Sequence, residues 1–198
     1  MGDLIILSER LADRSRPART GRAAFFFDPT CPFSYLAAER VERVLGEVEW
    51  VPTASVAFRR VARAEPPEAV RANAERCAAA LRLPLIWPDR FPADSPAALR
   101  ATAYAAEIGA GARFALAAIR LAFCGGFDLE DPEIIAAAAA AAGVPRDSCL
   151  AAAADKARDA PVHATASALR ARGVRRLPAI RIGRRFYAGE HATKPLTT

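Results

Sequence analysis

The chain has no apolar run that approaches the length needed to cross a membrane. Residues 4–7 are apolar, but they are too few for the core of a secretory signal, and the acidic Asp3 precedes them. These absences argue against a membrane span and a secretory leader, so we expect a cytoplasmic protein with no membrane partner. Hydrophobic residues still make up 53% of the 198 residues, enough to bury the core of one domain with a sizeable insertion.

Cysteine and histidine are also scarce, with four and two residues respectively. Widely spread cysteines indicate free thiols in a reducing setting and not a disulfide framework. His163 and His191 lie far from any cysteine pair, which argues against a zinc site, and we expect no metal. We interpret Cys77, Cys124 and Cys149 as buried, inert thiols, and His163 and His191 as a structural and a solvated histidine.

Lysine occurs only at positions 156 and 194, so arginine carries most of the positive charge behind the net charge of +6. The arginines gather in two clusters, at residues 59–63 and 172–185. A solvated basic surface is the default interpretation, and nucleic-acid binding is a minor alternative that we do not expect. We prefer the hypothesis that the second cluster attracts an anionic substrate or the carboxylate of a thiol cofactor.

The fourth cysteine, Cys31, stands in a different setting. An apolar stretch at residues 25–27 reads as a strand, and the run Asp28-Pro29-Thr30-Cys31-Pro32 leads from it into a helix that Gly46 ends. Unpaired backbone amides in the first turn of a helix stabilise negative charge. The sequence therefore predicts a lowered pKa for the Cys31 thiol. Asp28 is expected to accept hydrogen bonds from nearby amides, and its charge would oppose formation of the thiolate.

The motif around this cysteine is C-x-x-S, with Ser34 where a second cysteine would close a disulfide. Cys31 could simply pack as a small apolar residue, but its context favours a mixed disulfide, a bound thiol cofactor or a nucleophile. Whether the Ser34 hydroxyl donates a hydrogen bond to the Cys31 sulfur stays open.

Two further segments complete the α/β pattern. Residues 48–52 alternate like a short strand, so the N-terminal part forms a βαβ unit with Cys31 at the carboxyl end of its first strand, where open α/β sheets bind ligands. Far downstream, Pro178 begins or edges a strand and Gly183 allows a hairpin turn. Residues 55–160 read as helices only, with an alanine-rich helix ending at Gly143 that we interpret as packing.

These segments together resemble the thioredoxin fold, in which a cis-proline loop faces a thiol at a helix start. More narrowly, the chain is similar to the DsbA family, in the branch of 2-hydroxychromene-2-carboxylate isomerases and kappa-class glutathione transferases. The resemblance rests on Phe-Asp-x-x-x-Pro-Phe-Ser-Tyr-Leu-Ala at residues 27–37, on Leu-Pro-Leu-Ile-Trp-Pro-Asp-Arg-Phe-Pro at residues 83–92, and on residues 173–189. It implies an N-terminal extension at 1–22, thioredoxin-like halves at 23–54 and 161–198, and a helical insertion at 55–160.

The resemblance also implies a site. Cys31 and Ser34 would be its catalytic residues, while Leu177, Pro178 and Glu190 would hold glutathione or another low-molecular-weight thiol. Relatives in the isomerase branch normally carry a serine at the position of Cys31. The helical insertion would roof a pocket for an apolar or aromatic carboxylate substrate. Its candidate wall residues are Trp87, Phe91, Tyr104, Phe114 and Phe123, although each by itself is more typical of core packing.

Three hypotheses follow from this sequence. The first is a thiol oxidoreductase that acts through Cys31, with an external thiol resolving the mixed disulfide. The second is a glutathione-dependent isomerase or transferase in which Cys31 replaces the serine. The third is a non-catalytic binding module. The sequence is also compatible with a homodimer.

Overall fold

The structure is a computed structural model that describes residues 22–59, 65–190 and 192. Its centre is a four-stranded sheet in the order β2-β1-β3-β4, formed by β1 (Ala24–Phe27), β2 (Glu49–Pro52), β3 (Ala179–Ile182) and β4 (Arg185–Ala188). β1 and β2 are parallel, whereas β3 runs antiparallel to β1 and β4 antiparallel to β3. The predicted N-terminal βαβ unit and the hairpin at Gly183 are therefore both present.

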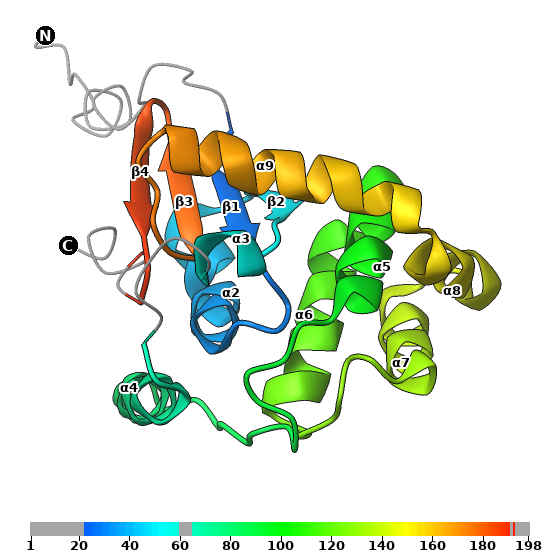
Figure 1. The fold of residues 1–198 in the computed structure, drawn as a ribbon, viewed down its shortest axis with the longest axis horizontal. Coiled ribbons are helices and arrows are strands. Elements are labelled where there is room, and N and C mark those ends of the chain that lie inside the picture. The colour runs from blue at the N-terminus through cyan, green and yellow to red at the C-terminus, as the bar shows by residue number, and fades with distance from the viewer. Residues whose placement is uncertain (1–21, 60–64, 191, 193–198) are drawn as a thin grey trace, which may run out of the picture.

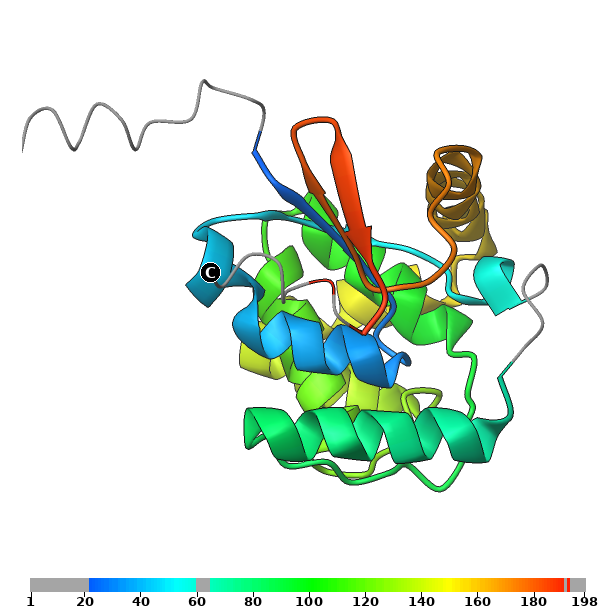
Figure 2. The ribbon, with the colours of Figure 1, turned by 90° about the vertical axis from the view of Figure 1, so that its left-hand side faces the viewer.

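Helices cover both faces of the sheet (Figures 1 and 2). α2 (Pro32–Leu45) packs on one face, and α9 (Asp159–Ala171) with the short α3 (Val56–Arg59) packs on the other. Because side chains alternate along a strand, Phe25 and Phe27 point toward α2 while Phe26 points toward α9. Phe25 and Phe27 stack with ring centroids 5.3 Å apart, and both meet the edge of Trp50.

The remaining helices follow one another between β2 and β3. They are α4 (Pro67–Leu81), α5 (Pro96–Glu107), α6 (Gly111–Phe123), α7 (Pro132–Ala142) and α8 (Arg146–Ala154), with the 3-10 turn η1 (Lys156–Arg158) before α9. Ser95 and Asp131 cap α5 and α7 with their side-chain oxygens, as their positions before proline predict. α4 ends at Leu81, and Arg82 follows in the left-handed conformation.

The alanine-rich helix is a packing element, as predicted. Ala138 and Ala139 of α7 are fully buried, and they belong to the same apolar core as Phe25 and Phe27 of the sheet. Alanine lets helices approach closely while costing little helix stability. A single core thus runs from the α2 face of the sheet into the helices α5 to α8, which fixes the insertion against the end of β1 where Cys31 lies.

Candidate active site

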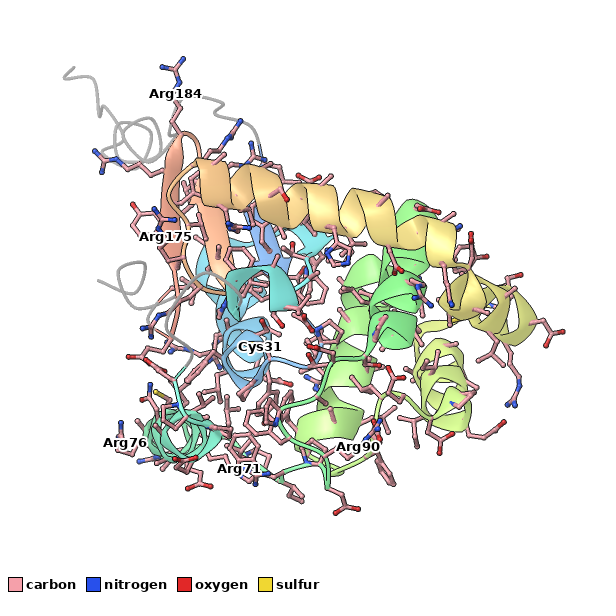
Figure 3. The ribbon with its side chains drawn as sticks, viewed as in Figure 1. Cys31, Arg71, Arg76, Arg90, Arg175 and Arg184 are labelled. Atoms are coloured by element: carbon pink, nitrogen blue, oxygen red, sulfur yellow. The ribbon has the colours of Figure 1, made fainter. Side chains whose placement is uncertain are left out.

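Cys31 occupies the N-cap position of α2, and Pro32 is the first residue of the helix. Its backbone amide donates to the Asp28 carbonyl at 3.0 Å, and its carbonyl accepts from the Tyr35 amide at 3.1 Å. The side chain caps no backbone amide of the helix and is half-buried. Figure 3 shows Cys31 at the start of α2, near the centre of the molecule.

A loop from the far end of the sequence faces this sulfur. The Leu177–Pro178 peptide bond is cis. The Cys31 thiol donates a weak hydrogen bond to the Leu177 carbonyl, with 3.9 Å between sulfur and oxygen and 146 residues between the partners. The Pro178 carbonyl accepts from the Gly189 amide at 2.8 Å, which ties this loop to the end of β4. Three of the predicted site residues, Cys31, Leu177 and Pro178, therefore lie together.

The predicted lowering of the Cys31 pKa is wrong. Burial raises the pKa of the Cys31 thiol above its ordinary value, and this effect outweighs the hydrogen bonds of the Ser34 amide, the Ser34 hydroxyl and the Phe33 amide, which lower it. The Asp28 carboxylate adds to the rise. The groups at the start of α2 therefore lower the Cys31 pKa as expected, but burial of the sulfur raises this pKa by more.

Ser34 is fully buried, and its hydroxyl has two roles in this turn. It accepts a hydrogen bond from the Asp28 amide at 3.3 Å, and it forms a hydrogen bond that lowers the pKa of Cys31. The Ser34 hydroxyl therefore lies next to the Cys31 sulfur. It joins the end of β1 to the first turn of α2.

Asp28 is a structural carboxylate, as its position predicts. Its Oδ1 accepts from the amide and hydroxyl of Thr30, at 2.8 and 2.7 Å, and its Oδ2 accepts from the Ser55 amide at 2.7 Å. The side chain therefore holds the loop after β1 against the loop after β2. These bonds keep a negative charge close to Cys31.

Glu190 follows β4 and accepts a hydrogen bond from the side-chain amide of Asn73 on α4. The Cys77 thiol lies 3.8 Å from the other polar atom of Asn73, its Oδ1. Sequence reasoning missed Asn73, because an isolated asparagine within a helix carries no signal of a partner 117 residues away. His191, expected to be a solvated loop residue, lies outside the described residues.

The five aromatic residues proposed for the pocket wall lie in different surroundings. Phe114 and Phe123 are buried in the core. Trp87 and Phe91 contact each other with centroids 4.6 Å apart, and the guanidinium of Arg71 lies 4.8 Å from the Trp87 ring. Tyr104 lies beneath the guanidinium of Arg158 at 5.4 Å. Core packing is therefore correct for Phe114 and Phe123, and Trp87 and Tyr104 are partly buried against the same core.

A cavity of about 240 Å³ lies beside the site, between the sheet and the insertion. Asp28, Ala54, Leu99 and His163 are among its lining residues, and none of the five aromatic residues is. One wall is a bidentate ion pair in which Arg100 donates to both carboxylate oxygens of Asp159, at 2.7 and 3.0 Å. The hydrogen bond from Arg100 lowers the pKa of Asp159 and fixes α5 against α9.

The other cysteines differ from one another. Cys149 is fully buried, and burial raises its pKa to about 11, in agreement with an inert thiol. Cys77 and Cys124 are half-buried, so the expectation of full burial is wrong for them. The Cys124 thiol donates to the Tyr35 hydroxyl at 3.4 Å, and this hydroxyl donates to the Pro84 carbonyl at 2.6 Å. These two hydrogen bonds hold the Cys124 side chain in place although it is only half-buried.

Within the described ranges, no group of three or more histidine, cysteine or acidic side chains is arranged to hold a metal ion. None of the helices in the same ranges is both long and apolar enough to pass through a membrane.

The family follows from a match to residues 23–196 by the model of the DSBA-like thioredoxin domain. The chain belongs to the DSBA-like thioredoxin domain family. No curated protein matches its sequence.

Two solved structures illustrate the likeness. A 2-hydroxychromene-2-carboxylate isomerase superposes with a TM-score of 0.73 at 16% identity, over 88% of this chain and 91% of that one. A structure from Streptomyces coelicolor, titled a probable DsbA oxidoreductase, gives a TM-score of 0.69 at 23% identity, over 89% and 86%. At these identities the likeness concerns the fold, and the predicted DsbA-like thioredoxin fold is confirmed.

Proposed function

We propose that this chain is a thiol-dependent oxidoreductase that exchanges disulfides through Cys31 as a single thiol. The observation that carries the proposal is the position of the Cys31 sulfur at the start of α2, 3.9 Å from the Leu177 carbonyl and next to Pro178. A partner lying along the Leu177–Pro178 backbone would bring its own sulfur in front of Cys31. Family membership supports thiol chemistry in general.

The proposed reaction has two exchange steps. In the first, Cys31 loses its proton to solvent and attacks one sulfur of a small disulfide, RSSR. The S–S bond of RSSR breaks, a mixed disulfide of Cys31 with RS forms, and the departing RS⁻ takes up a proton. In the second, a thiol R′SH attacks the RS sulfur, forms RSSR′ and releases Cys31, which regains a proton. The external thiol is needed because Ser34 stands where a resolving cysteine would be.

The proposed partner thiol is glutathione or another low-molecular-weight thiol in the cytoplasm. Its backbone would lie against Leu177 and Pro178 in an extended pose. Glu190, held by Asn73, would then contact the amino group of such a peptide. The raised pKa of Cys31 makes the first step slow at neutral pH, so the proposal requires exchange to speed up as the pH rises.

The same raised pKa favours a second candidate, a glutathione-dependent isomerase. A Cys31 that stays protonated is a hydrogen-bond donor, like the serine hydroxyl of the isomerase branch. It would then hold the sulfur of bound glutathione and would form no disulfide with it. The aromatic carboxylate substrate would bind between the sheet and the insertion, where the 240 Å³ cavity lies.

One set of variants separates the candidates. The protein is incubated with glutathione disulfide at pH 7 and pH 9, and the mixed disulfide is measured by intact mass and located by peptide mapping. Disulfide exchange predicts modification at Cys31, faster at pH 9, and its loss in Cys31→Ser. Cys77→Ser is the matched control, because Cys77 is also half-buried, and it should exchange as the parent does.

Isomerisation of 2-hydroxychromene-2-carboxylate with glutathione is measured on the same proteins. Activity that survives Cys31→Ser, together with no mixed disulfide in the parent, would replace the oxidoreductase by the isomerase. A parent with neither reaction at either pH would overturn both and leave a binding module.

A further inference from the structure

We propose that a hollow beside β4, lined by arginines, binds a small ligand that carries phosphate groups. The hollow has a volume of about 460 Å³ and lies between the loop after α9 and the outer strand β4. Arg172, Arg175, Arg176, Arg184 and Phe186 are among its lining residues. Figure 3 shows Arg175 beside β4 and Arg184 at the turn between β3 and β4. Neither Cys31 nor Pro178 is part of this hollow, so it is separate from the thiol site.

The charges of these arginines are poorly balanced by the protein. Arg176 pairs with Glu65 at 3.0 Å, and both side chains are largely exposed. No acidic partner of Arg172, Arg175 or Arg184 is seen among residues 22–59, 65–190 and 192. Several guanidinium groups around one hollow repel each other, and an anion between them relieves that repulsion. The hollow is therefore a place where a bound anion gains more energy than at a single surface arginine.

Phosphate suits these side chains better than a lone carboxylate. Each guanidinium presents a planar fork of donors that matches two phosphate oxygens, and several forks can share one phosphate group. The carboxyl end of α9 (Asp159–Ala171) works against any anion here, because its unpaired carbonyls carry partial negative charge. Arg172 directly follows this helix, and its positive charge offsets the partial negative charge of the carbonyls. The remaining arginines then attract the ligand, and their attraction is strongest for a ligand with more than one negative charge.

Phe186 adds an apolar surface at the side of the hollow. Its ring lies 6.0 Å from the guanidinium carbon of Arg172 and 6.2 Å from the ring of Phe26 beneath it. The ring is thus held in place between α9 and the sheet. A planar group attached to the phosphates, such as a nucleobase, can contact the part of this ring that lines the hollow. The volume of the hollow falls within the range of small-molecule sites, which favours a compact ligand over a polymer.

The test measures binding of pyrophosphate, ADP and adenosine to the full chain by titration calorimetry in low salt and in physiological salt. We expect pyrophosphate and ADP to bind, adenosine not to bind, and salt to weaken both complexes. The double variant Arg172→Gln/Arg175→Gln should weaken pyrophosphate binding at least about tenfold, because each lost guanidinium removes charge-assisted hydrogen bonds. Phe186→Leu should weaken ADP and leave pyrophosphate unchanged.

A matched control removes the same charge elsewhere. Arg43→Gln/Arg146→Gln changes two exposed arginines of α2 and α8, away from the hollow, and should bind pyrophosphate as the parent does. Equal losses in both double variants, or no loss in either, would overturn the site. So would a single-stranded oligonucleotide whose affinity rises with length while pyrophosphate does not bind, since that marks a nucleic-acid surface. Melting curves check that the variants are folded, and Cys31→Ser should bind pyrophosphate normally.

Discussion

The starts of α2 and α8 each carry a cysteine, and the two thiols differ in what surrounds them. Cys31 directly precedes α2, whereas Cys149 is the fourth residue of α8 and its amide already donates to the Pro145 carbonyl at 3.0 Å. Burial raises the pKa of both thiols. At Cys31 the amides of Ser34 and Phe33 oppose this rise, but at Cys149 nothing opposes it.

As a general rule, a helix start lowers a thiol pKa when two conditions hold. Free amides of the first turn must reach the sulfur, and the sulfur must keep enough contact with water for its anion to be stable. Cys149 meets neither condition. Cys31 meets the first, and its position against the Leu177 carbonyl weakens the second.

The largest expected difference between the two thiols is in their accessibility. At pH 8, iodoacetamide should modify Cys31 at least about 100-fold faster than Cys149, because the buried thiol reacts only when α8 opens. Peptide-resolved mass spectrometry measures both rates in one sample, and it distinguishes them from the rates of Cys77 and Cys124. In denaturant the two rates should become similar. A Cys149 that reacts as fast as Cys31 in the folded protein would contradict the difference in accessibility between the two thiols.

The pH dependence of Cys31 gives the next largest effect. Because its pKa is raised above the ordinary 9.0, the thiolate fraction and the alkylation rate should rise about tenfold per pH unit from pH 7 to pH 9. The rate constant is measured at each pH with the peptide-resolved assay. A plateau near pH 7 would mean that the helix start prevails over burial, as the sequence alone predicts.

The contrast between Cys31 and Cys149 also shows how much of the structure the sequence predicts. The strand at residues 25–27, the helix after Pro32 and the caps Ser95 and Asp131 are local features, and local rules predict them. The resemblance to a family was needed to bring Leu177 and Pro178 to Cys31, because no spacing within the sequence relates residues 146 apart. The direction of the Cys31 pKa was missed for the same reason, since distant segments produce its burial.

Two other features show the same limit. The contact between Asn73 and Glu190 joins α4 to the end of β4, and neither residue signals the other. The arginines at 172–185 are visible as a cluster in the sequence, but only the structure shows which of them share a hollow with Phe186. Composition thus predicts the charge, and the packing of α9 against the sheet decides where it is concentrated.

Ser34 offers a smaller test of the same comparison. Ser34→Ala removes a hydrogen bond that lowers the Cys31 pKa, so alkylation of Cys31 at pH 7 should slow by about threefold. The variant also leaves the Asp28 amide without its partner, and it should lower the free energy of unfolding by about 1 kcal/mol. Ser148→Ala, an exposed serine in α8, is the control and should change neither the rate at Cys149 nor the stability.

The smallest effect concerns Asp28, whose charge ranks below burial and the Ser34 hydrogen bonds among the influences on Cys31. Asp28→Asn removes that charge, which should lower the Cys31 pKa and speed alkylation at pH 7 by about twofold. The asparagine keeps one oxygen, so it can accept from Thr30 or from Ser55 but cannot replace both contacts. A melting curve therefore accompanies the rate, because a loosened turn would also expose the sulfur. Asp147→Asn makes the equivalent change at the start of α8 and should leave the Cys149 rate unaltered. A rate at Cys31 that stays constant or falls would show that the Asp28 charge is screened from the sulfur, leaving burial alone to separate Cys31 from an ordinary thiol.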